Sequence, residues 1–330
     1  MIGHNNEKPT IMQLNKLTTL LVFFGGLGIN NQLGAQLSSS PTDPAEARIV
    51  YDDVVNFIDA FNMLSYSADT IDILQKYYID KGTPGLKIFI EKYDLTAPKL
   101  AAKIRQYPDD YAAVGAKLEW LRSIEPTIRL YFHKLKTFIP NAVYPPTYYL
   151  IGRRRGIGSG SIEGQLITIE KQAVDTFDIG IEGHIIHELT HLNQLHAIGS
   201  LDKYLAIYND EKSLLAICIR EGVAEFFAEL VTGEGKQEAL NYLAKHEMEI
   251  WRRFEMDMWG TDTKDWIWQE PKFPEQPQDV GYVIGAKIVE YYYKHATDLE
   301  EAVNTILSIT DYRDFLEKSG YEEKFKKSDY

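Results

Sequence analysis

Residues 187–191 read His-Glu-Leu-Thr-His and stand inside an apolar stretch, 181–198, whose large side chains recur at helical spacing. At about 100° per residue, the isoleucine and leucine side chains of this stretch collect on one face of a helix. His187, His191 and Gln194 collect on the opposite face. The stretch therefore predicts a helix that packs through its apolar face and presents two imidazoles on the other.

Two imidazoles at this spacing can hold one metal ion. Residues i and i+4 lie one turn apart on a helix, so His187 and His191 can both reach a Zn²⁺ at ~2.0–2.1 Å. Glu188 lies beside them, where it can accept the proton of a water molecule whose pKa the metal lowers toward ~7. The alternative is an amphipathic helix with incidental histidines, but two buried imidazoles would still need polar partners. We therefore predict a zinc site with Glu188 as the general base.

The third metal ligand must come from elsewhere in the chain, and three patterns compete for it. One class of zinc hydrolases requires Gly at position 194 and His at position 197, but the chain has Gln194 and Ala197, which excludes that class. An aspartate ligand could come from residues 260–265, although a polar turn explains that segment better. The third pattern is a glutamate on the next helix, and Glu221 and Glu225 supply it about thirty residues further on.

Glu221 and Glu225 lie one turn apart in a predicted helix, 210–231, that is otherwise largely apolar. Two like charges on such a helix are costly unless a cation faces them. We predict Glu221 as the third zinc ligand and Glu225 as the acceptor for a ring N–H of His187, which would support the ligand from outside. Gly222 would allow the helix to approach a neighbour closely. An exposed helix face is the alternative for this pair.

Three further features of the sequence carry no ligand or catalytic assignment. His184, one turn before His187, could border the site, whereas His196 falls on the apolar side of the helix and is expected to pack. Residues 156–160 read Gly-Ile-Gly-Ser-Gly, but no helix and no Gly-Lys-Ser/Thr ending follow, so a hairpin connection is favoured over a phosphate-binding loop.

The combination of His187-Glu188-x-x-His191 with Glu221-Gly222-x-Ala224-Glu225 resembles the gluzincin clan of metallopeptidases, and in particular bacterial families described as predicted secreted zinc-dependent peptidases of unknown function. The resemblance covers residues 148–295. It implies a zincin-like lobe with an active-site helix and a small sheet.

The same resemblance extends to residues 281–285, which read Gly-Tyr-Val-Ile-Gly. It implies a catalytic role for Tyr282, which would stabilise the oxyanion. It also suggests that the strand 165–169 is an edge strand along which a peptide substrate lies antiparallel; a scaffold strand is an equally good interpretation.

The start of the chain carries an export signal. Lys16 precedes an apolar stretch, 17–29, and small residues follow at 33–35, so residues 1–35 are predicted to be a signal peptide that is removed. The remaining chain is expected to have no stable membrane span and to be periplasmic or extracellular, although an uncleaved N-terminal anchor is the alternative. Cys218 is the only cysteine, so no intrachain disulfide can form.

Composition and periodicity predict a mainly helical α+β fold with a small mixed or antiparallel sheet. With 330 residues and 45% apolar side chains, the chain can bury a substantial core. We expect a helical lobe at 36–140 and a zincin-like lobe at 141–330. The predicted strands are 147–151 and 165–169, and the predicted helices of the second lobe are 181–198, 210–231, 236–258, 282–293 and 298–308.

The predicted function is that of an exported zinc metallopeptidase that acts on a peptide or protein substrate. Two alternatives stay open: an exported zinc-containing binding or assembly protein without turnover, and a zinc hydrolase of non-peptide amides or esters. The formal net charge of -13 argues against nucleic acid as a partner, because a phosphate-binding surface requires clustered Lys and Arg.

Overall fold

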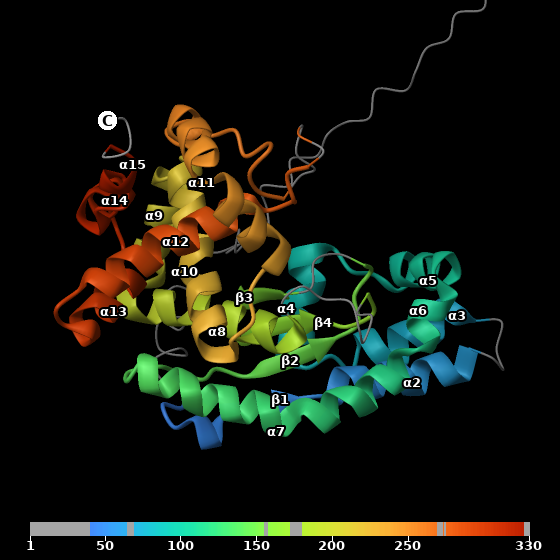
Figure 1. Ribbon diagram of the computed structural model, residues 1–330. Helices are drawn as coiled ribbons and strands as arrows, with labels where there is room; N and C mark the ends of the chain where they lie inside the picture. Colours follow the sequence, from blue (N-terminus) through green and yellow to red (C-terminus); the bar gives the residue numbers. More distant parts are fainter. Residues whose placement is uncertain are drawn as a thin grey trace, which may run out of the picture.

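The computed structural model describes residues 40–64, 69–154, 158–171, 180–268, 273 and 275–326. The predicted signal peptide, 1–35, lies outside these residues. The structure is mainly helical with one small mixed sheet, which confirms the predicted α+β class (Figure 1). None of the described helices is both long enough and apolar enough to cross a membrane.

The sheet has four strands in the order β1-β2-β4-β3, namely β1 (Ile49–Val50), β2 (Thr147–Leu150), β4 (Gly164–Thr168) and β3 (Gly158–Ser161). β1, β2 and β4 are parallel, and β3 pairs with β4 as an antiparallel hairpin. The suggestion that residues 165–169 form an edge strand is therefore wrong, because β3 occupies that edge.

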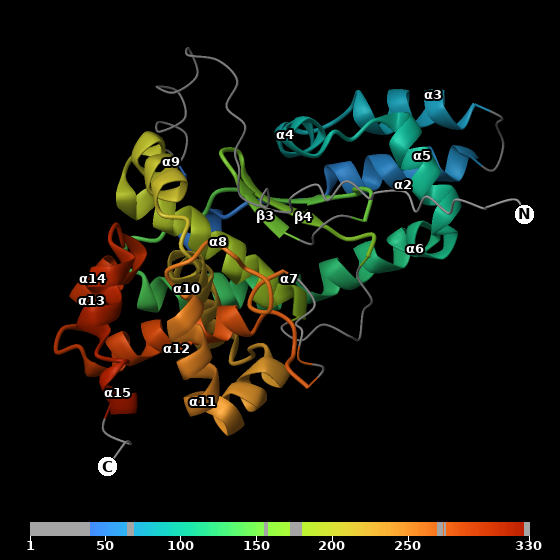
Figure 2. The ribbon, with the colours of Figure 1, turned by 90° about the horizontal axis from the view of Figure 1, so that it is seen from above.

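The N-terminal part of the chain contributes one strand and a set of helices. α2 and α4 pack on β2, and α4 also contacts β4. Figure 2 shows the β3–β4 hairpin between α4 and α8. α7 contacts α2, α8 and α10 and so joins the two parts of the molecule. The helices of this part are the 3-10 helix Pro44–Glu46, α2 (Asp52–Leu64), α3 (Thr70–Leu74), the π-helix Gln75–Ile79, α4 (Pro84–Tyr93), α5 (Ala97–Gln106), α6 (Pro108–Ala112) and α7 (Val114–Phe138).

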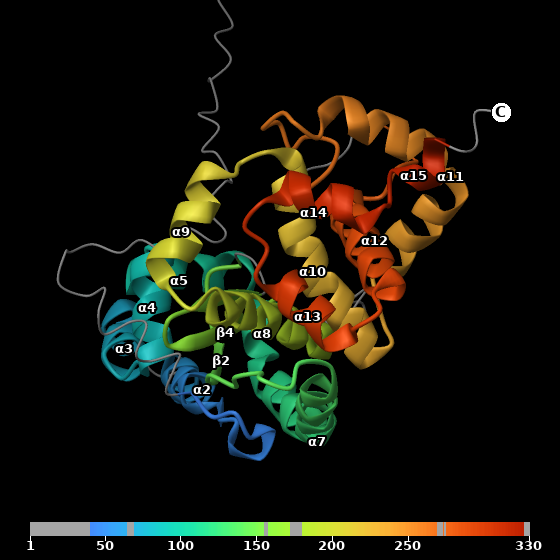
Figure 3. The ribbon, with the colours of Figure 1, turned by 90° about the vertical axis from the view of Figure 1, so that its left-hand side faces the viewer.

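The C-terminal part is a stack of helices on the sheet, in which α8, α10 and α12 follow one another (Figure 3). All five helices predicted for this part are present, but the helix expected at 210–231 begins at Leu214. Ser213 caps the start of α10 by accepting the N–H of Ala216 at 3.2 Å. Residue 210 is the last residue of α9, a helix that was not predicted. The helices are α8 (Gly180–Ile198), α9 (Leu201–Asp210), α10 (Leu214–Thr232), α11 (Gln237–Asp257), α12 (Val280–His295), α13 (Leu299–Leu307), α14 (Tyr312–Ser319) and α15 (Glu323–Lys326).

One continuous core connects the two parts. Phe57 and Tyr78 from the first part belong to the same buried apolar cluster as Tyr149, Ile185 and Ile219 from the second. Burial of this shared cluster is the main stabilising contribution that the fold offers. The division into two lobes near residue 140 stays a prediction.

Candidate metal centre

The helix α8 presents its polar residues to another helix rather than to solvent. Ile185 and Leu189 pack into the core, as predicted. His187 and His191 are also buried, with 6% and 3% of their surface exposed, because α10 covers the face on which they lie. Both faces of α8 are thus removed from water, so the imidazoles need polar or metal partners.

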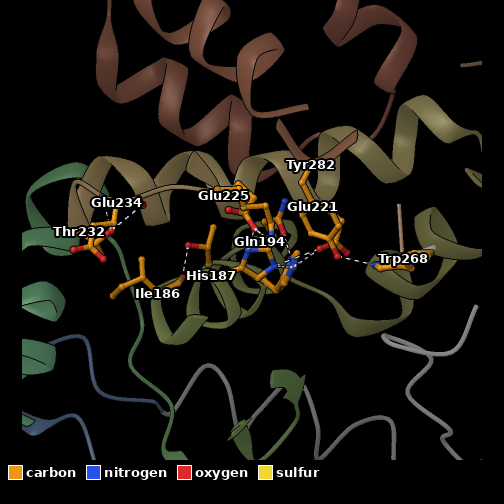
Figure 4. Close-up of polar contacts among 12 residues, drawn as sticks. Ile186, His187, Gln194, Glu221, Glu225, Thr232, Glu234, Trp268 and Tyr282 are labelled. Atoms are coloured by element: carbon orange, nitrogen blue, oxygen red, sulfur yellow. Dashed lines mark hydrogen bonds and ion pairs between the residues drawn. The ribbon is translucent and has the colours of Figure 1, made fainter. Parts of the chain in front are cut away.

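α10 supplies the third donor. Glu221 lies on α10 and is drawn in Figure 4 together with His187. His187 Nε2 lies 3.1 Å from His191 Nε2 and 3.3 Å from Glu221 Oε2, and His191 Nε2 lies 3.5 Å from the same oxygen. Ligand atoms at ~2.0–2.1 Å from a tetrahedral zinc lie roughly 3.3 Å from one another. The three donor atoms therefore already have the separations that one Zn²⁺ requires.

The outer nitrogen of each imidazole faces its own acceptor. His187 Nδ1 lies 3.2 Å from Glu225 Oε1, which Lys236 Nζ approaches to 3.8 Å. His191 Nδ1 lies 2.8 Å from the amide oxygen of Gln194, to which it can donate. The Gln194 contact favours an N–H on Nδ1 of His191, and the negative charge of Glu225, which makes no hydrogen bond to His187 Nδ1, favours one there as well. With a metal bound, each Nε2 would then be the ligand atom. The sequence placed Gln194 on the histidine face but gave no reason to assign it this contact.

The charges of the site favour a cation between its carboxylates. Burial alone would lower the pKa of His187, but the adjacent carboxylates of Glu221 and Glu225 raise this pKa to about 10. Burial would raise the pKa of Glu221, yet His191 and His187 hold it well below its usual range. The imidazoles lower the pKa of both Glu221 and Glu225, and a divalent cation held by the same donor atoms could supply this positive charge instead of a proton.

Glu188 lies between the histidines and the hairpin. Its side chain packs against Gly158 of β3, where a Cβ would come within 2.7 Å of both Cγ and Oε1 of Glu188. Glu188 Oε2 is buried and has no hydrogen-bond partner among the described residues. One carboxylate oxygen beside the donor atoms is thus available to a water molecule or a substrate proton.

Tyr282, which the resemblance implied near the site, lies in the first turn of α12 beside His187. The two ring centroids are 6.1 Å apart. The Tyr282 hydroxyl accepts a hydrogen bond of 2.7 Å from Trp268 Nε1 (Figure 4), which leaves its own proton to donate. Burial, with Glu221 adding to it, raises the pKa of Tyr282 well above its usual value, so the hydroxyl stays protonated. No pattern in the sequence indicated Trp268.

The remaining sequence candidates lie outside the donor group. Burial, with Lys236 adding to it, lowers the pKa of His184 to about 3, so this half-buried ring beside the site is neutral. His196 is in the last turn of α8 and is partly exposed. The segment 260–265 is a polar turn as expected, in which Asp262 accepts the N–H of Lys264 at 3.0 Å. In the described part of the chain, the one cluster of potential metal ligands is the His–His–Glu group.

The fold and the site together define a mainly helical α+β protein with a buried His–His–Glu group that can hold a metal ion. A family of predicted Zn-dependent proteases (DUF2268) matches residues 145–309, half of the chain, and the protein belongs to this family. The match includes the whole candidate metal centre and excludes the helices α2–α7. No curated protein and no solved structure gives a significant match.

Proposed function

We propose that this protein is a zinc metallopeptidase of the gluzincin type, with His187, His191 and Glu221 as metal ligands and Glu188 as general base. The observation that carries the proposal is a donor group of three with Glu188 adjacent to His187 in α8, whose Oε2 has no hydrogen-bond partner among the described residues. Structural zinc sites use four protein ligands, whereas catalytic sites use three and keep one position open. Membership of a family of predicted Zn-dependent proteases supports the same assignment.

The residues around the metal position have separate roles in the proposed reaction. When bound, zinc would polarise a carbonyl group and increase the acidity of a water molecule. Glu188 Oε2 accepts the proton of the attacking water and returns it to the nitrogen of the leaving amine. The Tyr282 hydroxyl, held by Trp268, donates to the oxygen on which negative charge develops. Glu225 keeps His187 oriented.

Metal analysis combined with digestion of a broad peptide library tests this proposal. The purified protein is expected to contain about one zinc per chain and to cleave peptides. Glu188→Gln is expected to retain zinc and to lose activity by on the order of 10³-fold, because it removes the base without removing a ligand. Bound zinc without cleavage of any peptide would favour a binding or assembly role, and cleavage of esters or non-peptide amides alone would favour the other hydrolase class. Absence of zinc would overturn the proposal.

Export is the second part of the proposed function and is supported by residues 16–35 alone. A charged residue, an apolar stretch and small residues in this order are typical of a cleaved signal peptide. Cell fractionation followed by N-terminal sequencing tests it, and a mature start near Gln36 in the periplasm or medium is expected. A protein found only in the cytoplasm with an intact N-terminus would contradict export without affecting the zinc assignment.

A further inference from the structure

Among the described residues, no strand pairs with the outer edge of β3, whose Gly158 lies against Glu188 beside the metal centre. Gln165 and Ile169 donate their backbone N–H groups toward the β2 segment. Backbone groups alternate in direction along a strand, so the residues opposite them on β3 direct their own groups away from β4. Gly160 pairs with Gln165, and Gly158 pairs with Ile167, whose backbone groups point in the same direction as those of Gln165. The N–H and C=O groups of both glycines therefore point to the open edge.

Lys92 from the N-terminal helices reaches this edge. It lies in the last turn of α4, and its Nζ donates to the carbonyl oxygen of Gly160 at 3.3 Å. The side chain is half-buried, and none of the described carboxylates lies within ion-pair distance of it. Burial lowers the pKa of Lys92 to about 8, while the charge of Glu188 favours the protonated form. An ammonium group that has no ion-pair partner among the described carboxylates thus lies within electrostatic reach of the proposed general base, Glu188.

We propose that Lys92 binds a carboxylate of the peptide substrate, so that the enzyme prefers substrates with negative charge close to the scissile bond. The inference rests on the proposed peptidase function. A peptide that adds to the open edge of β3 would pass the Lys92 ammonium group, and a half-buried ammonium that has lost part of its hydration gains most from an anionic partner. The carboxylate can belong to an Asp or Glu side chain or to the C-terminus of the peptide.

A structural role of Lys92 makes a different prediction. Lysines at edge strands prevent unwanted strand pairing, and in that role Lys92 would serve the hairpin without contacting substrate. Replacing it would then change protein stability and would affect activity toward all substrates equally. Only a direct contact between Lys92 and the substrate makes kcat/KM depend on substrate charge. This dependence therefore distinguishes the two roles.

The test uses peptides that differ only by Glu or Gln at one position, each as the free acid and as the C-terminal amide. For the zinc-loaded wild-type protein, kcat/KM is expected to be about tenfold higher for the carboxylate-bearing member of the preferred pair. Lys92→Met should reduce that ratio to about one, Lys92→Arg should retain it, and Lys92→Glu should reverse it in favour of the uncharged Gln or amide member of the pair. The Glu/Gln pairs and the acid/amide pairs identify which carboxylate is bound.

Lys87→Met is the matched control, because Lys87 is an exposed lysine of the same helix. It removes the same charge from α4 and should leave the ratio unchanged. Equilibrium binding of the same peptides to zinc-loaded Glu188→Gln, with and without Lys92→Met, gives a readout that needs no turnover. An unchanged carboxylate preference in Lys92→Met, or no preference in wild type in either assay, overturns the assignment of Lys92. Failure of wild type to cleave any peptide would instead count against the peptidase function.

Discussion

Glycine allows close packing at two places in this molecule. The two places differ in which group lies where a Cβ would be. Between α10 and α12, Gly222 and Gly285 face the backbone of the partner helix, and a Cβ on Gly285 would overlap the carbonyl group of Cys218. Between β3 and α8, Gly158 faces the side chain of Glu188, which its Cβ would approach to 2.7 Å. A helix backbone cannot yield without moving the helix, whereas a carboxylate can yield alone.

The difference indicates that metal binding and turnover depend on separate contacts. The helix pair α10–α12 fixes the helix that carries Glu221, so it determines whether the donor group exists. The contact between β3 and α8 positions Glu188, so it determines whether a bound metal can support catalysis. Changes on the two sides should therefore have different effects on zinc content and on activity.

The largest effect is expected on the α10 side, at the donor itself. Glu221→Ala should abolish zinc binding, because two imidazoles alone hold zinc weakly and the buried site loses its compensating charge. Glu225→Ala should weaken zinc binding by about 10–100-fold, because it removes only the partner of His187. Zinc titration of both variants measures this. The reverse order of effects would exchange the two assignments.

The next effect concerns the helix contact itself. Gly285→Ala should reduce the free energy of unfolding by about 3 kcal/mol, because the added Cβ overlaps the backbone of α10 and the helices must separate. Gly115→Ala is the matched control: Gly115 lies in the first turn of α7 with no atom within 4 Å of an added Cβ, so it should stabilise by at most about 0.5–1 kcal/mol. Chemical denaturation measures both. Equal stability of the two variants would show that the helix contact is not close-packed.

The sequence predicted the helices that carry the donor group better than it predicted the β3–β4 hairpin. His187, His191 and Glu221 lie on regular helices, where spacing alone determines which residues share a face. Gly222 indicated a close helix contact, but the partner proved to be α12, which the spacing within α10 cannot specify. The existence of the main helices was predictable for the same reason, although α9 was not predicted and the helix expected at 210–231 begins only after the capping residue Ser213.

The hairpin side was not predictable because its residues carry no periodic signal. β3 reads Gly-Ser-Gly-Ser, which has low strand propensity, so the true edge strand was interpreted as a connection. Lys92 and Trp268 come from segments far from the His-Glu-x-x-His motif in sequence, and only the tertiary fold brings them to it. The contact between Gly158 and Glu188 depends on register, which the strand sequences did not define.

A smaller effect is expected at Gly158. Gly158→Ala should retain zinc and lower kcat by on the order of 10²-fold, because the added Cβ displaces the Glu188 carboxylate by a fraction of an ångström to an ångström. Parallel measurement of zinc content and peptide cleavage tests this. Loss of zinc in this variant would show that the two sides are coupled after all.

The smallest effect is expected two residues further along the same strand. Gly160 also faces α8, but a Cβ there would meet the methyl end of Leu192 at 3.3 Å, and a leucine methyl group can rotate away. Gly160→Ala should therefore change kcat/KM and the free energy of unfolding only slightly, within about 0.5 kcal/mol. Because both substitutions add one methyl group to β3 on the same face, any general effect on the hairpin would appear in both. A large loss of activity in Gly160→Ala would mean that the strand, and not the position of Glu188, limits turnover.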